Sequence, residues 1–181
     1  MATRSVIGVM YGDVCKSVSC HWDGYLEGVG ATLLENYGRV GASELVALGD
    51  ISSLGTEIGD AHFFSHHDYE AVRSAECNRL EEAGLDRNSC ALPPMSYEEF
   101  NKIYGHMTAF YGRDRDDEGS EFLTANSYQE FLEQRDGSWA EYYYIMGNDN
   151  QWYVSTPYDT QLRLLEEALE AERAADMKEQ A

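Results

Sequence analysis

Residues 1–22 alternate between apolar and polar positions as two adjoining β-strands do. Residues 5–11 are β-branched and apolar, residues 12–13 are Gly-Asp and can turn the chain, and most apolar side chains in residues 14–22 share one parity. This pattern predicts a hairpin with one buried face. Cys15 and Cys20 have opposite parity, so we expect them on opposite faces of the second strand and not paired with each other.

The middle of the chain shows shorter and less regular patterns. Leucines and a tyrosine in residues 31–37 predict a short helix that ends at Gly38, and residues 43–48 predict one or two further helical turns. Residues 49–60 are rich in turn-forming types, so we expect an irregular backbone there. We expect the least ordered internal stretch between residues 76 and 94.

Two helix starts are marked by capping residues in the second half of the chain. Ser96 with Glu99 forms a capping box before apolar residues at helical spacing. Ser127 with Glu130 offers a second capping box. We therefore expect one helix after each serine.

The C-terminal part of the chain predicts a second hairpin and a final helix. Residues 140–146 and 151–155 are aromatic and β-rich, and a Gly-Asn-Asp-Asn turn separates them. Thr156-Pro157 favours the start of a helix whose apolar face runs from Leu162 to Leu169. Beyond Glu172 we expect this helix to fray.

The order of hairpin, helices, hairpin and helix predicts an α+β fold. We expect a single domain over residues 1–172, with a small antiparallel sheet that the N- and C-terminal hairpins form and several helices packed on it. Residues 173–181 are expected to be a frayed C-terminal tail.

Charge is unevenly distributed along the chain. There are 33 Asp and Glu against 13 Lys and Arg, for a formal net charge of −20 at pH 7, yet residues 1–40 hold four acids and three bases. A strongly acidic surface repels nucleic acid and anionic membrane and attracts basic protein surfaces. The plainer interpretation is that the acids only keep the protein soluble.

Several classes of protein are disfavoured by the sequence. No apolar stretch approaches the roughly 20 residues that cross a bilayer, and no long apolar segment near the N-terminus resembles a secretory signal, so we expect a cytoplasmic protein. The GxSxG and GxGxxG motifs are missing. We therefore expect no catalytic residues, no cofactor and four free cysteines.

The acidic residues beyond Gly41 are the candidate partner-binding groups. The segment GRDRDDEGS is predicted to be a charged loop with its acids in solvent, held in shape by pairing with Arg113 and Arg115. The candidates are Glu98, Glu99, Asp114, Asp116, Asp117, Glu118 and Glu121, with Glu166, Glu167 and Glu170 on the last helix, where a solvated face is the plainer account.

An alternative site lies in the neutral N-terminal region. Its aromatic side chains offer stacking surfaces, its glycines allow close backbone approach, and a helix begins near Ala31 with its amide end toward the same loop. A nucleotide could bind there; the alternative is that Trp22 and Tyr25 are core anchors. The candidate ligand-binding residues are Arg4, Lys16, His21, Trp22, Tyr25 and Arg39.

Three histidines invite comparison with metal sites. His62 and His66 have the i, i+4 spacing that chelates a metal on a helix, and His67 follows them. No Glu lies inside the pair as a general base, and Cys77 is not at a zinc spacing. Surface or capping roles are the plainer interpretation, and we expect no metal site.

The N-terminal segment, residues 1–55, resembles a known family in the runs MATRSVIGV, CHWDGYLEGVGATLLENYG and LGDISSLG. The family consists of small, largely uncharacterised accessory proteins encoded by tailed bacteriophages, with an N-terminal CHWDGYxEGVG-type pattern. The likeness is weaker around FYGRDRDDEG and EYYYIMGNDNQWY and absent between Thr56 and Ser96, and Leu26 stands where the pattern has Pro. The resemblance implies a phage origin and an accessory role, and it assigns no active-site residues.

Two function classes follow. The first is a phage inhibitor without enzymatic activity whose acidic surface imitates nucleic acid and occupies a basic surface of a host defence or nucleic-acid-processing protein, in the cytoplasm of the infected bacterium. The second is a binder that sequesters a nucleotide signal at the N-terminal region. A weaker third alternative is a hydrolase or transferase that uses His21 or the histidine cluster. Neither direct nucleic-acid binding nor membrane binding is expected.

Overall fold

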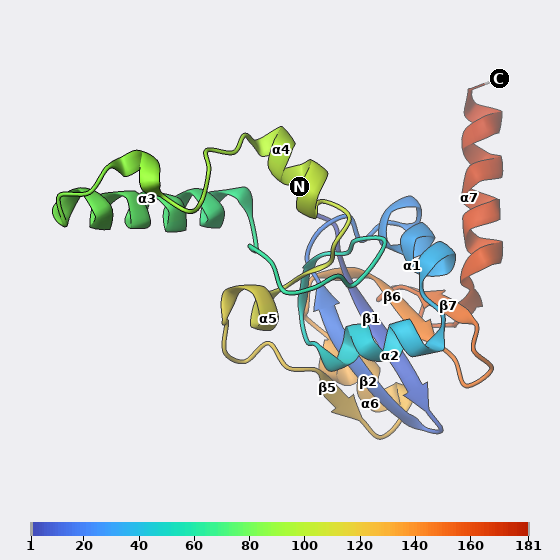
Figure 1. Cartoon of the computed structure of the whole chain (residues 1–181). Helices are drawn as coiled ribbons and strands as arrows, with labels where there is room; N and C mark the ends of the chain where they lie inside the picture. The colour runs from blue at the N-terminus through green and yellow to red at the C-terminus, as the bar shows by residue number, and fades with distance from the viewer. Residues whose placement is uncertain (1, 181) are drawn as a thin grey trace.

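Eight strands form one mixed sheet in the computed structural model, which describes residues 2–180 (Figure 1). The strand order is β4-β3-β2-β1-β6-β7-β8, and β5 pairs with β2 outside this path. The strands are β1 (Arg4–Tyr11), β2 (Val14–Cys20), β3 (Ile51–Ser53), β4 (Ala109–Phe110), β5 (Leu123–Ala125), β6 (Ala140–Met146), β7 (Trp152–Ser155) and β8 (Arg163–Leu164).

Both predicted hairpins are present. β1 and β2 are antiparallel with Ser5 opposite Cys20, and β6 and β7 are antiparallel with Met146 opposite Trp152. The predicted α+β fold is confirmed, but the sheet is mixed and not purely antiparallel, because β1 pairs in parallel with β6, and β2 in parallel with β3. The two hairpins therefore share one continuous sheet, with β1 and β6 at its centre.

The sheet is buried on both faces. Ile7, Val18 and Cys20 belong to one apolar cluster together with Leu45 of the second helix, whereas the opposite face carries Cys15 in a second cluster. The prediction of a hairpin with one buried face is therefore wrong, because a helix covers the second face as well. The prediction that Cys15 and Cys20 lie on opposite faces is confirmed.

Within residues 2–180, seven α-helices accompany the sheet, with one π-helical and one 3-10 segment. Leu33, Leu45 and Leu165 bring α1, α2 and α7 onto one face, and Phe131 brings α6 onto the other. The helical segments are η1 (Leu26–Gly30), α1 (Ala31–Asn36), α2 (Arg39–Ala47), α3 (His66–Glu82), η2 (Arg87–Ser89), α4 (Tyr97–Tyr104), α5 (Tyr111–Arg115), α6 (Tyr128–Arg135) and α7 (Leu165–Glu179).

Two elements project from the sheet. Figure 1 shows α3 and η2 extending to the left as an arm and α7 rising on the right. The arm includes much of the stretch between residues 76 and 94 that we expected to be least ordered. Its first part is helical, because α3 continues to Glu82, although only Tyr69 and Cys77 are buried along this helix. The return of the chain is held by Tyr69 Oη, which donates to Pro93 O at 2.7 Å, and by a 2.7 Å contact between His66 Nε2 and Met95 O.

The last helix begins later than the sequence predicts. Asp159 N donates to Thr156 Oγ1 at 3.0 Å, but this cap closes a turn and not a helix. The chain then adds the short edge strand β8 before α7 starts at Leu165. The helix continues to Glu179, so residues 173–179, predicted to be part of a frayed tail, are helical and mostly exposed. Among residues 2–180, no helix is both long and apolar enough to cross a membrane.

Candidate partner-binding surface

The charged segment after β4 starts from a buried carboxylate. α5 is a short helix, and the side chain of Asp114 within it has no exposed surface. Its Oδ2 accepts a hydrogen bond from Phe110 N at 2.9 Å, and its Oδ1 accepts one from His62 N at 3.2 Å. Asp114 therefore fastens the start of α5 to a distant, earlier segment of the chain.

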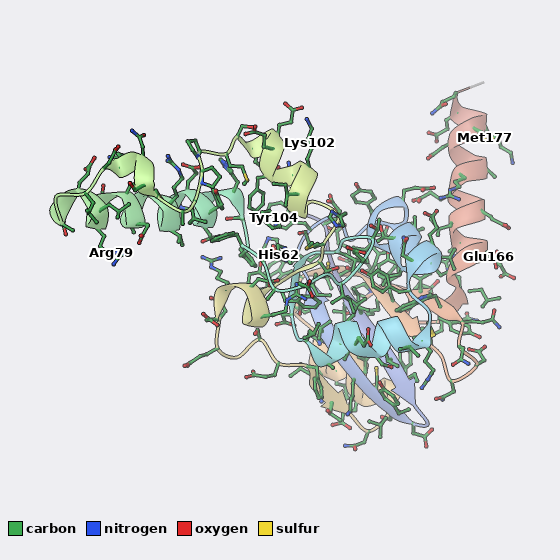
Figure 2. All side chains as sticks on the ribbon, viewed as in Figure 1. His62, Arg79, Lys102, Tyr104, Glu166 and Met177 are labelled. Carbon is green, nitrogen blue, oxygen red and sulfur yellow. The ribbon has the colours of Figure 1, made fainter. Side chains whose placement is uncertain are left out.

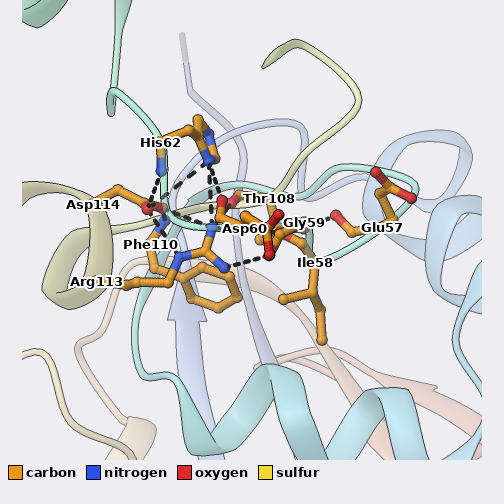
Figure 3. A network of polar contacts seen from close by, with 9 residues as sticks. All are labelled: Glu57, Ile58, Gly59, Asp60, His62, Thr108, Phe110, Arg113 and Asp114. Carbon is orange, nitrogen blue, oxygen red and sulfur yellow. Dashed lines mark hydrogen bonds and ion pairs between the residues drawn. The ribbon is translucent and has the colours of Figure 1, made fainter. Parts of the chain in front are cut away.

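Arg113 neutralises this carboxylate and extends the network. Its Nε donates to Asp114 Oδ1 at 2.9 Å and its Nη2 to Oδ2 at 3.1 Å, which is the bidentate geometry that a guanidinium forms with a carboxylate. Nη1 donates to Gly59 O at 2.8 Å, and Nη2 also donates to Thr108 O at 3.0 Å. Figure 3 shows these contacts converging on the guanidinium.

Aromatic rings cover the same network. The guanidinium of Arg113 lies 4.7 Å from the ring centroid of Phe110. The ring of His62 stacks on Tyr104 of α4, with centroids 5.6 Å apart and an angle of 11° between the planes. Because a buried ion pair stabilises only when its remaining donors and acceptors are satisfied, these contacts are what make the arrangement favourable. The base of the charged loop is a fixed structure.

The loop beyond this base is acidic and exposed. Asp116 ends α5 in the left-handed region at φ 58°. Among the described residues, one guanidinium pairs with an acid of the loop: Arg115 Nε lies 3.9 Å from Asp117 Oδ1, and both side chains are about half-exposed. We define the acidic loop as its four exposed acids, Asp116, Asp117, Glu118 and Glu121.

Asp114 is a correction to the sequence prediction. We expected four clustered acids in solvent, but Asp114 is buried and serves as an anchor, because backbone amides and Arg113 satisfy its oxygens. The expectation that Arg113 pairs with an acid and holds the loop in shape is confirmed.

Glu98 and Glu99 lie apart from the acidic loop in the fold, on α4. Glu99 completes the predicted capping box, and the hydrogen bond from Ser96 N lowers the pKa of its carboxyl. Glu98 is exposed and lies 3.6 Å from Lys102 Nζ. Both carboxylates therefore already interact with groups of α4 or its N-cap.

The C-terminal helix presents a further set of acids. Leu165, Ala168 and Leu169 face the body, and Glu166 on the same two turns is exposed. Figure 2 shows Glu166 near the body and Met177 near the free end of the helix. The exposed acids of this part of α7 are Glu166, Glu167 and Glu170.

The N-terminal candidates do not form one site. Arg4 begins β1, and His21 lies opposite it just beyond the end of β2, since Ser5 pairs with Cys20. Arg39 instead donates to Met10 O at 2.6 Å, six residues further along β1, which at about 3.3 Å per residue is roughly 20 Å away. Lys16 also lies at that end, with its Nζ 5.0 Å from the ring centroid of Phe122.

The aromatic loop of this region is exposed, and its amides are occupied. Trp22 is 48% and Tyr25 45% exposed, so the interpretation of both as core anchors is wrong. Val29 N donates to Asp23 O at 2.8 Å and Gly28 N to Tyr25 O at 3.0 Å, which uses the amides that a phosphate would need. Gly28 serves close packing: an added Cβ would lie 2.2 Å from Asp23 O.

The histidines have structural partners. α3 begins at His66, so His62 and His66 do not share a helix, and the i, i+4 argument for a chelating pair does not apply. Nδ1 of His62 lies 2.9 Å from Asp60 O, and Nε2 of His66 lies 2.7 Å from Met95 O. His67 is exposed, and the described residues contain no group of three or more potential metal ligands.

Comparison of the chain with protein-family models, with curated proteins and with solved structures gives no match.

The sequence analysis missed two charged residues that lie against β2, Asp50, which is partly buried, and Arg135, which is buried. Asp50 precedes β3, and its Oδ1 accepts from Ser19 N at 2.8 Å. Arg135, at the end of α6, is 5% exposed and donates to Ser17 Oγ at 2.8 Å and to Ser19 Oγ at 3.0 Å. A cation in the last turn of a helix is commonly exposed to solvent, where it interacts favourably with the helix dipole. No local sequence signal therefore indicates that Arg135 is buried.

Proposed function

We propose that this protein is a bacteriophage accessory protein without enzymatic activity that binds a basic surface on a host protein through its acidic loop. The host surface is one that normally holds nucleic acid, in a defence or nucleic-acid-processing protein, and occupying it inhibits that protein. The phage origin rests on the likeness of residues 1–55 to small phage proteins, and the binding mode rests on the loop.

The observation that carries the proposal is the contrast between Asp114 and the acids that follow it. One acid is buried, paired and anchored, whereas Asp116, Asp117, Glu118 and Glu121 are exposed, with a single guanidinium paired among them in the described chain. Uncompensated charge held on a fixed base is suited to a complementary basic surface, because little conformational freedom is lost on binding. The acids of α7 add to the same long-range field.

The test is capture from a bacterial host lysate on the immobilised protein, followed by mass spectrometry. We expect a specific partner with a basic surface, retained at low salt and released at high salt, because the Debye length falls from about 10 Å at 0.1 M to about 3 Å at 1 M. A partner that binds equally well at both salt concentrations, or one without a basic surface, would contradict the acidic-surface mechanism.

A further inference from the structure

A cavity of about 220 Å³ opens at the end of the sheet where β1 begins and β2 ends. Its wall includes Arg4 of β1, Ser19 of β2, His21 just beyond β2, and Asp50 before β3. Ser5 of β1, Tyr111 of α5 and Ser138 beyond α6 add to the polar lining. The cavity therefore draws on segments between residues 4 and 140. It adjoins the start of the acidic-loop segment, because Asp50 N donates to Ser120 O at 2.7 Å, next to Glu121.

The positive side of the cavity is Arg4. The register of the hairpin places Arg4 on the same face of the sheet as Val6, Ser19 and His21. Within residues 2–180, no carboxylate lies within 4.0 Å of its guanidinium. Burial and the charge of Arg4 both lower the pKa of His21, so the imidazole beside it is neutral at pH 7 and adds no second charge. Arg4 is free to bind an anionic group.

The negative side is Asp50. Its Oδ1 accepts from Ser19 N at 2.8 Å, and Oδ2 has no hydrogen-bond donor among the described residues. The nearby Arg135 directs its donors to Ser17 and Ser19 and forms no ion pair with this carboxylate in the described part of the chain. One carboxylate oxygen therefore stays available on a wall that also carries Arg4.

We propose that this cavity binds a small zwitterion of the size of an α-amino acid, with its carboxylate on the guanidinium of Arg4 and its ammonium on Oδ2 of Asp50. The two charges of opposite sign line one cavity without pairing with each other, which is the complement of a molecule that carries both. Guanidinium groups match carboxylates in geometry, and charge-assisted hydrogen bonds are the stronger ones.

The volume limits the ligand. At about 220 Å³, the cavity is smaller than the roughly 300 Å³ at which pockets for drug-sized molecules begin. The volume therefore favours a ligand smaller than a nucleotide. Cys20 also lines the cavity, but burial raises the pKa of its thiol to about 12, so it stays protonated and does not capture the ligand covalently.

The test is a titration of the ¹⁵N-labelled protein with glycine into the millimolar range, since so small a ligand makes few contacts. In NMR spectra we expect saturable chemical-shift changes at the backbone amides of Arg4, Ser19, His21 and Asp50. Acetate, methylammonium and adenosine monophosphate are the comparison ligands, and each should bind at least about tenfold more weakly than glycine because it lacks one charge or is larger than the volume favours.

Two variants separate binding from folding. Asp50→Asn keeps an oxygen for Ser19 N and loses the charge, and Arg4→Gln changes an exposed side chain; each should weaken glycine binding about tenfold or more. Arg163→Gln, at an exposed position on β8, is the control and should bind as the original protein does. Absence of shifts with glycine, equal binding of acetate, preferred binding of adenosine monophosphate, or unchanged binding by Asp50→Asn would each overturn the proposal, whatever becomes of the acidic loop.

Discussion

Arg113 and Asp114 are neighbours in the sequence, and they form a buried bidentate ion pair in the fold, with Nε–Oδ1 and Nη2–Oδ2 distances of 2.9 and 3.1 Å. The carboxylate has no exposed surface, and the guanidinium side chain is 15% exposed. Because both side chains also bond to backbone groups of other segments, this single pair joins α5 to the chain near Gly59 and His62.

Removing the anchor should destabilise the protein. Asp114→Ala leaves the buried Arg113 without its carboxylate and two backbone amides without an acceptor, and we expect a loss of about 3–5 kcal/mol in the free energy of unfolding. Glu118→Ala, at an exposed position on the same loop, should change it by less than about 0.5 kcal/mol. Urea denaturation of both variants measures the difference, and equal stabilities would show that Asp114 is no anchor.

The two tryptophans at Trp22 and Trp152 should differ in their contribution to stability. Trp152 is 4% exposed and donates from Nε1 to Tyr37 O at 2.7 Å, so Trp152→Ala should cost about 3–5 kcal/mol. Trp22 is 48% exposed, and Trp22→Ala should cost roughly half of that or less. Thermal unfolding of the two variants provides the comparison, and a Trp22→Ala loss as large as that of Trp152→Ala would restore the interpretation of Trp22 as a core anchor.

Asp50 should make stability depend on pH in a defined direction. Burial raises its pKa above the ordinary value of 3.8, so the folded state holds this proton more tightly than the unfolded state does. Ionisation of Asp50 therefore lowers stability as the pH rises from 3.8 through its folded-state pKa. Asp50→Asn removes this effect and should be more stable than the original protein at pH 7, with a gain that disappears near pH 3.8. A gain of the same size at both pH values would refute this role of the carboxyl.

Thiol reactivity should separate the partly exposed Cys90 from the buried Cys15 and Cys20. Cys15 and Cys20 are buried, and burial raises the pKa of each to about 12, whereas Cys90 is partly exposed. Since the thiolate is the reactive form, a thiol-specific reagent should modify Cys90 first in the folded protein, and Cys15 and Cys20 only on unfolding. Peptide mapping after brief labelling identifies the modified residue. Rapid labelling of Cys20 would contradict its burial.

Local sequence signals predicted the local structure. The parity of residues 1–22 indicated the β1–β2 hairpin, the Gly-Asn-Asp-Asn turn indicated β6–β7, and Ser96 with Glu99 indicated the start of α4. Each of these depends on contacts between residues close in sequence, which periodicity and capping rules describe directly.

Contacts between distant segments were not predictable from the same patterns. The parallel pairing of β1 with β6 joins Arg4 to Ala140, and nothing near either residue specifies it. The burial of Asp114 depends on His62, and the cavity beside Asp50 depends on both β1 and β2. From the sequence alone, the charged segment around Asp114 is expected to be a solvated loop, because the donors that satisfy its carboxylate are known only from the fold.

The role of the acidic loop is tested most directly by the dissociation constant of the purified complex with the captured host protein, measured for two variants of equal net charge. In the loop variant, Asp116 and Asp117 become Asn while Glu118 and Glu121 become Gln. The control variant neutralises four exposed acids elsewhere, namely Asp13, Glu44, Asp136 and Glu141.

We predict that the loop variant binds at least about tenfold more weakly than the original protein, and that the control variant loses much less, because charge at the contact acts more strongly than charge screened over a Debye length. Circular dichroism should show both variants folded, since the Arg113–Asp114 anchor is untouched. Equal affinity of the loop variant and the original protein would contradict the acidic loop as the contact surface.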